Sequence, residues 1–201
     1  CYMALATSNV EICNLALTKL GEDPITALTE DSKAGRLSNL HFARLRNVVL
    51  RSHTWNFAVK RASLAQSTVA PEYRFTAKYA LPDDFLRIID CNLLNDVSWK
   101  IEGKFLVCDA DTVKIRYIAQ IEDPGQFDEL FIEALAARIA SELAIPLADN
   151  VNLSDFMEQR YQRKLREART ADATEGNPEF LEASTWLDSR VDYNSPYPFE
   201  N

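Results

Sequence analysis

Two histidines are the first candidates for chemistry in this chain. His41 and His53 are the only histidines, and they stand twelve residues apart. A catalytic histidine needs a carboxylate to orient it and a nucleophile to activate, and no spacing around either position indicates such a triad. Twelve residues along a helix would separate them by about 18 Å, which is too far to share a metal ion. Both are therefore interpreted as surface or core side chains.

Two pairs of adjacent acids could divide the acid and base roles of a hydrolase. Glu22-Asp23 and Asp83-Asp84 each stand beside a proline in a turn-like sequence. Turns favour aspartate because its side chain bonds to the nearby backbone. A structural role is therefore favoured for both pairs over acid–base chemistry.

The remaining reactive residue types give no binding motif. No C-x-x-C pair occurs among the four cysteines, which are Cys1, Cys13, Cys91 and Cys108. A zinc site is therefore not predicted, and the cysteines are expected to be small buried hydrophobic residues. The five glycines show none of the spacings that cradle a phosphate group. No catalytic residue, cofactor or metal is predicted, and the chain is not expected to be an enzyme.

Composition indicates a globular chain of ordinary size. Its 201 residues suit a single domain. The net charge of −8 and a pI near 4.9 argue against a tight grip on nucleic acid, which depends on Lys and Arg neutralising phosphates. The first residues do not resemble a signal peptide, and no apolar run of about 18 residues occurs, so no membrane partner is expected.

The first sixty residues predict two helices and an aromatic core contribution. Ser8 and Glu11 form a capping box, so a helix is expected from Asn9 to Leu20, with Gly21 ending it. Asp31 or Ser32 caps a second helix. Its expected buried positions are Leu37, Leu40, Leu45, Val48 and Val49. The aromatic residues Trp55 and Phe57 follow it directly and are expected to plug the core.

The period of apolar residues then changes from helical to two. Alternation over residues 73–79 predicts a strand with one buried face. Further strands are expected over 85–94, 98–101, 104–108 and 113–117, with a tight turn at Glu102-Gly103. Residues 72–118 are thus predicted to form an antiparallel meander.

Two more helices follow the strands. Apolar residues cover most of the circumference of residues 127–145, which predicts a central buried helix ended by Pro146. Residues 154–170 predict a helix with one apolar stripe, made of Leu153, Met157, Tyr161, Leu165 and Ala168. Its basic residues are a possible docking or channel face: Arg160, Arg163, Lys164, Arg166 and Arg169. A solvated face, an acidic partner surface and DNA remain open for them.

The last thirty residues differ in character from the rest. Residues 172–201 hold seven acids against the single base Arg190, a local charge of −6. Prolines interrupt this segment, yet it is rich in aromatic residues. Docking on another subunit is favoured over packing back on its own domain, because segments that order on binding wrap large surfaces. The expected interface residues are Trp186, Leu187, Tyr193, Tyr197 and Phe199.

The expected fold class is α+β and mainly helical. An antiparallel helix bundle is predicted from residues 1–71 and 119–175. A small antiparallel β-domain is inserted at 72–118, and an extended C-terminal arm covers 176–201.

Three blocks of this sequence resemble the tail tubular protein A family, the head-to-tail adaptors of short-tailed phages. The first runs from Ile12 to Ala65 and includes Trp55-Asn-Phe-Ala and Lys60-Arg-Ala-Ser-Leu-Ala. The second is Tyr79-Ala-Leu-Pro-Asp-Asp-Phe-Leu-Arg-Ile. The third begins at Lys114-Ile-Arg-Tyr-Ile-Ala and runs through Asp123-Pro-Gly to Leu147. No block carries a catalytic motif, and the resemblance rests on their order and spacing.

The resemblance implies a structural virion protein. In that family a ring of adaptors, usually twelve, sits below the portal protein and receives the tail nozzle, a tubular protein B-like protein. DNA passes through the ring without specific binding. The C-terminal arm would reach the portal, and the location would be the virion tail, assembled in the host cytoplasm. Two alternatives remain open: a virion-associated peptidoglycan hydrolase and a non-viral intracellular scaffold protein.

Overall fold

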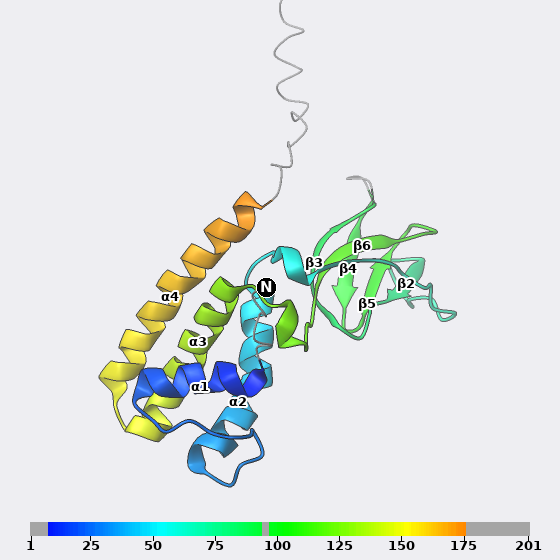
Figure 1. The fold of residues 1–201 in the computed structure, drawn as a ribbon. Coiled ribbons are helices and arrows are strands. Elements are labelled where there is room, and N and C mark those ends of the chain that lie inside the picture. Colours follow the sequence, from blue (N-terminus) through cyan, green and yellow to red (C-terminus); the bar gives the residue numbers. More distant parts are fainter. Residues whose placement is uncertain (1–7, 94–96, 176–201) are drawn as a thin grey trace, which may run out of the picture.

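The molecule consists of a helical part and a β part that lie side by side (Figure 1). The structure is a computed structural model that describes residues 8–93 and 97–175. The helices are α1 (Asn9–Leu20), α2 (Lys33–Arg51), α3 (Glu129–Ala148) and α4 (Val151–Thr174). The strands are β1 (Val59–Ser63), β2 (Ala77–Ala80), β3 (Phe85–Cys91), β4 (Trp99–Glu102), β5 (Phe105–Cys108) and β6 (Lys114–Ala119). Within the described residues, the predicted α+β, mainly helical fold class is confirmed.

Helix α1 begins and ends where its sequence predicts. The Ser8 hydroxyl accepts the Glu11 N–H at 3.1 Å, and the Glu11 carboxylate accepts the Ser8 N–H at 3.4 Å, which completes the capping box. Gly21 ends the helix in the left-handed region, at φ +77°. Ser32, rather than Asp31, caps α2 by accepting the Gly35 N–H at 3.0 Å.

The apolar stripe predicted for α2 is wrong at two positions. Leu40 is 70% exposed and Val48 is 46% exposed. The helix buries Leu45 and Val49 as predicted, and it also buries Phe42, which was not predicted. Leu40 lies five positions before Leu45, about 140° round the helix, so it cannot share that face. Apolar residue type alone did not distinguish the two sides.

An aromatic cluster joins the end of α2 to α3. Trp55 is fully buried, and its indole N–H donates to the Val49 carbonyl at 3.0 Å. Its ring meets the Phe131 ring edge-on, with centroids 5.1 Å apart. Phe57 is half-buried and lies 5.1 Å from the same ring. The predicted aromatic contribution to the core is therefore confirmed, with Trp55 as its centre.

Helices α3 and α4 form an antiparallel hairpin, and α1 runs across α3 (Figure 1). The prediction that Pro146 ends α3 is wrong, because the helix continues to Ala148. Pro146 has no N–H to donate to the Glu142 carbonyl, and its ring crowds that carbonyl, yet the next two residues remain helical. Asp149 then adopts φ +47° and donates its N–H to the Ile145 carbonyl. Asn150 caps α4, which starts three residues earlier than predicted.

The strands form two three-stranded antiparallel sheets rather than the predicted meander. One sheet has the order β1-β6-β3 and the other β2-β5-β4. Only β4 and β5 form the expected hairpin between neighbours in sequence. Strand β1 was not predicted, and it lies within the residues assigned to the helical core. It pairs with β6, about fifty residues further along the chain, so local sequence gave no sign of it.

The strand predicted over residues 73–79 is wrong in its first half. Tyr73 is 86% exposed, and β2 begins only at Ala77. Arg74 interrupts the extended backbone with φ +73° and places its guanidinium over the Phe75 ring. A residue in the left-handed region cannot continue a strand.

Candidate interaction surfaces

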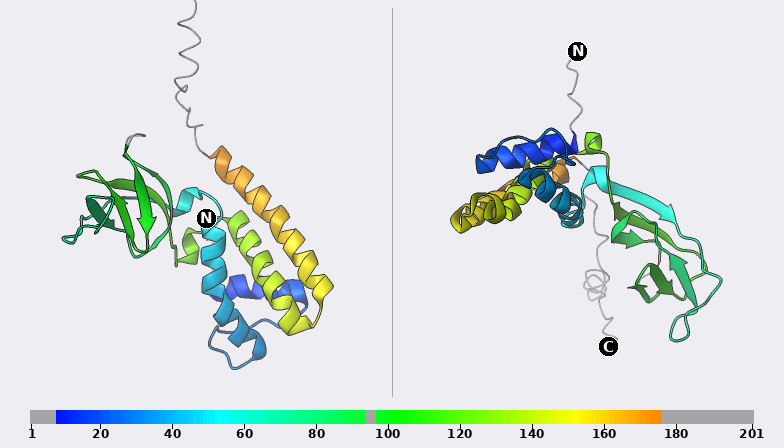
Figure 2. Two further views of the ribbon diagram at one scale, coloured as in Figure 1. Left: turned by 180° about the vertical axis from the view of Figure 1, so that it is seen from behind. Right: turned by 90° about the horizontal axis from the view of Figure 1, so that it is seen from below.

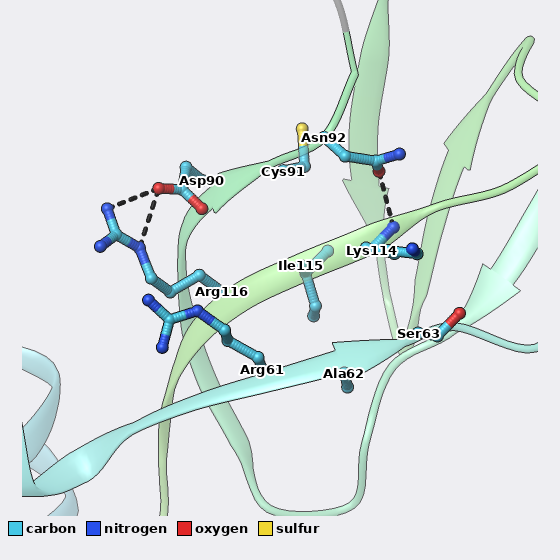
Figure 3. Close-up of a pocket in the computed structure, with 9 residues that line it drawn as sticks. All are labelled: Arg61, Ala62, Ser63, Asp90, Cys91, Asn92, Lys114, Ile115 and Arg116. Carbon is cyan, nitrogen blue, oxygen red and sulfur yellow. Dashed lines mark hydrogen bonds and ion pairs between the residues drawn. The ribbon is translucent and has the colours of Figure 1, made fainter.

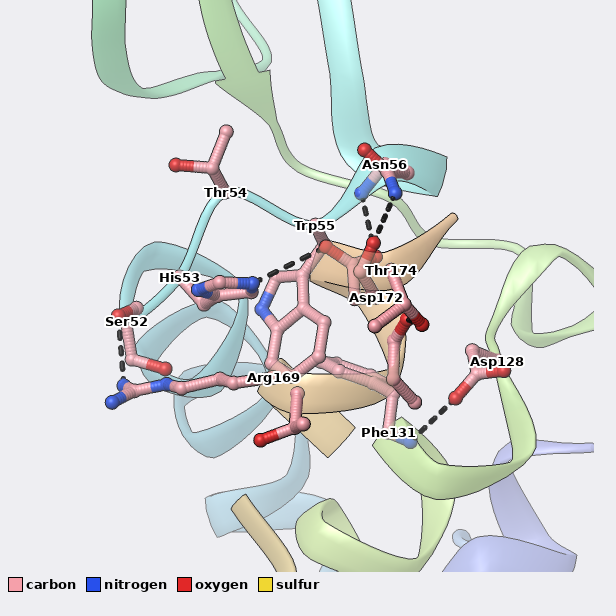
Figure 4. Close-up of polar contacts among 12 residues, drawn as sticks. Ser52, His53, Thr54, Trp55, Asn56, Asp128, Phe131, Arg169, Asp172 and Thr174 are labelled. Carbon is pink, nitrogen blue, oxygen red and sulfur yellow. Dashed lines mark hydrogen bonds and ion pairs between the residues drawn. The ribbon is translucent and has the colours of Figure 1, made fainter. Parts of the chain in front are cut away.

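His53 lies beside a carboxylate from a distant part of the chain (Figure 4). Its Nε2 is 3.2 Å from Asp172 Oδ2. Burial lowers the pKa of His53, and the Asp172 charge only partly opposes this shift. The ring also meets Trp55 edge-on at 4.8 Å. Neither neighbour has a hydroxyl or thiol that the His53 ring could activate as a nucleophile.

Asp172 fastens the last turn of α4 to the connection between α2 and β1. Its Oδ1 accepts the Asn56 N–H at 2.9 Å, and its carbonyl accepts the Asn56 side-chain amide at 2.7 Å. One turn earlier, Arg169 donates to the Ser52 carbonyl at 2.8 Å. Asp172 is 9% exposed, so the two bonds that it accepts from Asn56 are largely sheltered from water. We call this cluster the α4 anchor, and Figure 4 shows it.

The α4 anchor was missed in the sequence, although one signal for it exists. Asp172 continues the buried stripe of α4, four positions after Ala168 and seven after Leu165. An acid on an apolar stripe needs a partner, because burying an unpaired charge is costly. The partner Asn56 is 116 positions away in sequence. The stripe could therefore predict that Asp172 has a polar partner, but not which residue that partner is.

The acid Asp84 has a structural role in the described protein. Its carboxylate lies 2.7 Å from the Lys60 ammonium and accepts the Tyr117 hydroxyl at 2.9 Å. Burial disfavours the charged form, but these two partners together hold the pKa of Asp84 below its ordinary value. Burial, assisted by the Asp84 charge, raises the pKa of Tyr117 to about 12. This contact ties β1 and β6 to the turn before β3.

The thiols of Cys13 and Cys108 lie in the core of the described residues. Burial raises the pKa of Cys13 to about 12 and also raises that of Cys108, which keeps both thiols protonated and unreactive. Over residues 8–93 and 97–175, no group of three His, Cys, Asp or Glu side chains is placed to hold a metal ion. None of the helices in these ranges is long and apolar enough to cross a membrane.

The five basic residues predicted as a docking or channel face are spread around α4. They are Arg160, Arg163, Lys164, Arg166 and Arg169. Arg163 and Arg166 are exposed on the outer side of the helix. Lys164 forms an ion pair with Glu167 at 3.0 Å, and Arg169 donates a hydrogen bond to the Ser52 carbonyl within the α4 anchor. A docking surface on this helix would therefore consist mainly of Arg163 and Arg166.

A second basic surface, which the sequence did not indicate, lies on the solvent side of the sheet β1-β6-β3 (Figure 3). It encloses a shallow pocket of about 570 Å³. We call it the basic sheet face, and its polar members are Arg61, Ser63, Asp90, Asn92, Lys114 and Arg116. The opposite side of the sheet is apolar, since Ile115 and Tyr117 are buried there. Strand alternation thus separates the basic side from the core side.

Strand register places two arginines next to each other on the basic sheet face. Arg61 pairs with Arg116 across β1 and β6, and Arg116 pairs with Asp90 across β6 and β3. Arg116 donates to the Asp90 carboxylate through Nε at 2.9 Å and Nη2 at 2.6 Å. Figure 3 shows the Arg61 and Arg116 side chains reaching in the same direction. Like charges directly opposite each other are unfavourable unless a counter-charge is near.

The predicted interface residues of the C-terminal arm lie outside the described residues. They are Trp186, Leu187, Tyr193, Tyr197 and Phe199. The structure does describe the point from which this segment departs. That point is the end of α4, held by the α4 anchor beside the root of β1.

Comparisons with known proteins add no relative. No protein-family model matches the chain, and no curated protein matches it.

Proposed function

We propose that this protein is a structural virion component, a head-to-tail adaptor that forms a ring between the portal protein and the tail nozzle of a short-tailed phage. The proposal starts from the three sequence blocks that resemble the tail tubular protein A family. It includes a homo-oligomeric ring, about dodecameric as in that family, and DNA that passes through without specific binding. The place of action would be the virion tail, after assembly in the host cytoplasm.

The observation that carries the proposal is the meeting of the three blocks in one sheet. Strand β1 comes from the first block, β3 overlaps the second and β6 begins the third. Lys60 pairs with Tyr117, and Ile88 pairs with the same residue from the other side. The blocks are separate in sequence, yet they build one unit with the helices α1, α2 and α3. The three blocks that carry the resemblance therefore belong to the same folded unit.

The position of the α4 anchor supports an arm that reaches a partner. A docking arm needs a fixed base, because ordering a loose base on binding costs conformational entropy. Asp172, Asn56 and Arg169 provide such a base at the junction of the helical and β parts. The acidic segment that follows in sequence contains Trp and Tyr residues, which are common at the energetic centres of protein interfaces.

Native mass spectrometry of the protein with and without the portal of the same phage tests the proposal. We expect monomers or weak oligomers alone, and a portal complex with one closed ring of adaptors when the portal is present. Rings arise from head-to-tail contacts that close on themselves. A stable two-fold dimer that ignores the portal would contradict the proposal.

A further inference from the structure

The basic sheet face is open to solvent over the half that lies away from the helices. At its inner end, the same side of the sheet carries Val59 and Ile118, which pair across β1 and β6. Ile118 is fully buried and Val59 is half-buried. From there β1 leads away from the helical part, as the right-hand view of Figure 2 shows. The next two rows on this side begin at Arg61 and at Ser63, and both residues are exposed. The face is therefore accessible to a partner at these two rows.

Each exposed row contributes a positive charge that the face does not neutralise. In the first row Arg61 lies opposite Arg116, which binds Asp90 on its other side. In the second row Lys114 lies opposite Ser63. Over the part of the chain that the structure describes, neither the Arg61 guanidinium nor the Lys114 ammonium has a hydrogen bond or an ion pair. With three bases against one acid, the face attracts negative charge.

Most of the polar groups that remain available on this face are hydrogen-bond donors. The Asn92 side-chain oxygen accepts the Lys114 N–H at 2.7 Å, which leaves the amide NH₂ group to donate (Figure 3). The Asp90 carboxylate accepts two bonds from Arg116. The guanidinium of Arg61 and the ammonium of Lys114 can only donate. A ligand that satisfies these groups must bring acceptors and negative charge, as carboxylates do.

The distance between the two rows matches the repeat of an extended peptide. Arg61 and Ser63 are two positions apart on β1, and so are Lys114 and Arg116 on β6. The rows are therefore about 7 Å apart. Alternate side chains of an extended peptide point to one side with the same spacing. A peptide that runs parallel to the strands would thus bring one carboxylate to the first row and the next carboxylate to the second.

We propose that the basic sheet face binds an acidic, extended segment of a partner protein, with one carboxylate on Arg61 and the next carboxylate of the same side on Lys114. Asn92 and Ser63 donate to the second carboxylate. A nucleic acid duplex fits less well, because it carries one charge per about 1.7 Å of its axis. Asp90 lies within this face, and the whole chain carries −8, so both oppose such a dense line of phosphates.

This inference goes beyond the adaptor proposal and does not rest on it. Binding of an acidic segment requires the sheet β1-β6-β3 and no ring. Failure of ring assembly would count against the adaptor proposal alone. Failure of the experiment below would count against the basic sheet face alone.

Fluorescence anisotropy of a labelled synthetic peptide with the full chain tests the proposal. In the test peptide glutamate alternates with threonine, and in the control peptide glutamine replaces each glutamate. At about 0.15 M salt, where long-range attraction is screened, we expect the glutamate peptide to bind at least about tenfold more tightly than the glutamine peptide. Arg61→Glu and Lys114→Glu should each weaken binding of the glutamate peptide about tenfold, because each reversal replaces an attraction with a repulsion.

Two control variants separate this face from the charge of the whole chain. Lys104→Glu reverses an exposed base on the turn between β4 and β5, and it should bind the glutamate peptide as the parent does. The double variant Arg61→Glu with Lys114→Glu should instead bind a peptide in which lysine alternates with threonine, because the sign of the face is swapped. Both residues are exposed, so thermal unfolding should show that the variants keep the parent's fold.

Three outcomes would overturn the proposal. The first is a glutamate peptide that the parent binds no more tightly than the glutamine peptide, or that both single variants bind as well as the parent does. The second is a DNA duplex that binds the parent more tightly than the glutamate peptide and is lost in Arg61→Glu, which would make the face a phosphate site. The third is self-association of the parent that Arg61→Glu abolishes while the glutamate peptide does not bind, which would assign the face to a second copy.

Discussion

At the scale of single residues, the fold depends most on the aromatic cluster around Trp55. This side chain fills the space between α2 and α3 and donates its N–H to Val49. We expect Trp55→Ala to lower the free energy of unfolding by about 3–5 kcal/mol, because it leaves a large cavity at a fully buried position. Urea unfolding measures this loss. Tyr73→Ala is the matched control, since Tyr73 is 86% exposed and should change stability by less than about 0.5 kcal/mol. A similar small loss for both variants would show that the Trp55 site collapses without cost.

Tyr117 makes the stability of the protein depend on alkaline pH. Burial first, and then the neighbouring Asp84 carboxylate, raise the pKa of its hydroxyl to about 12. The folded-state pKa lies above the ordinary value near 10. This group's contribution is therefore fully present below pH 10 and is lost as the pH rises from about 10 to 12. Asp84 stays ionised throughout that range, because its pKa lies below its ordinary value.

Removing this hydroxyl tests its titration. We expect Tyr117→Phe to weaken the loss of unfolding free energy between about pH 10 and 12, while lowering stability at pH 7 by about 1 kcal/mol through the lost hydrogen bond. Urea unfolding at a series of pH values measures both effects. Tyr73→Phe removes an exposed hydroxyl and should keep the parent's pH profile. An unchanged profile in Tyr117→Phe would mean that other groups govern the alkaline loss.

At the scale of elements, the α4 anchor decides where the last helix ends in space. Asp172→Ala would leave the Asn56 N–H and the His53 ring without their shared acceptor. We expect it to lower the free energy of unfolding by about 2–3 kcal/mol, because the bonds involve a charged group and are buried. Thermal unfolding and hydrogen exchange in the last turn of α4 measure the effect. Asp155→Ala, at an exposed position of the same helix, should change little. Equal behaviour of the two variants would show that the anchor does not hold α4.

At the scale of the whole molecule, the body and the C-terminal segment have separate tasks. Among the described residues, all four helices and both sheets contribute to the core. We expect a chain ending at Gly176 to keep the free energy of unfolding within about 1 kcal/mol of the parent, because it loses no residue of that core. The same truncation should lose binding to the portal ring in native mass spectrometry. Replacing 177–201 with a Gly/Ser segment of equal length controls for chain length. Full binding by the truncated chain would move the docking surface to the body, with Arg163 and Arg166 as its first candidates.

The sequence determined those features that depend on nearby residues. The capping box at Ser8 fixes where α1 begins, because its bonds close within one turn. The stripe of α4 buried Met157, Tyr161 and Leu165 as expected, since helical periodicity is a local property. The switch of apolar period also placed strands between the second and third helices. The function inferred from the three blocks stays a prediction.

Tertiary structure alone decided which distant residues meet. The neighbours Arg61 and Arg116 follow from the register between β1 and β6, and no property of either segment by itself specifies that pairing. His53 contacts Asp172 only because the end of α4 packs against the segment before β1. Leu40 is exposed because the side of α2 that faces α3 is set by packing and not by residue type. Local hydrogen bonds and periodicity are encoded within a few residues, whereas burial and strand pairing depend on which surfaces the whole chain brings together.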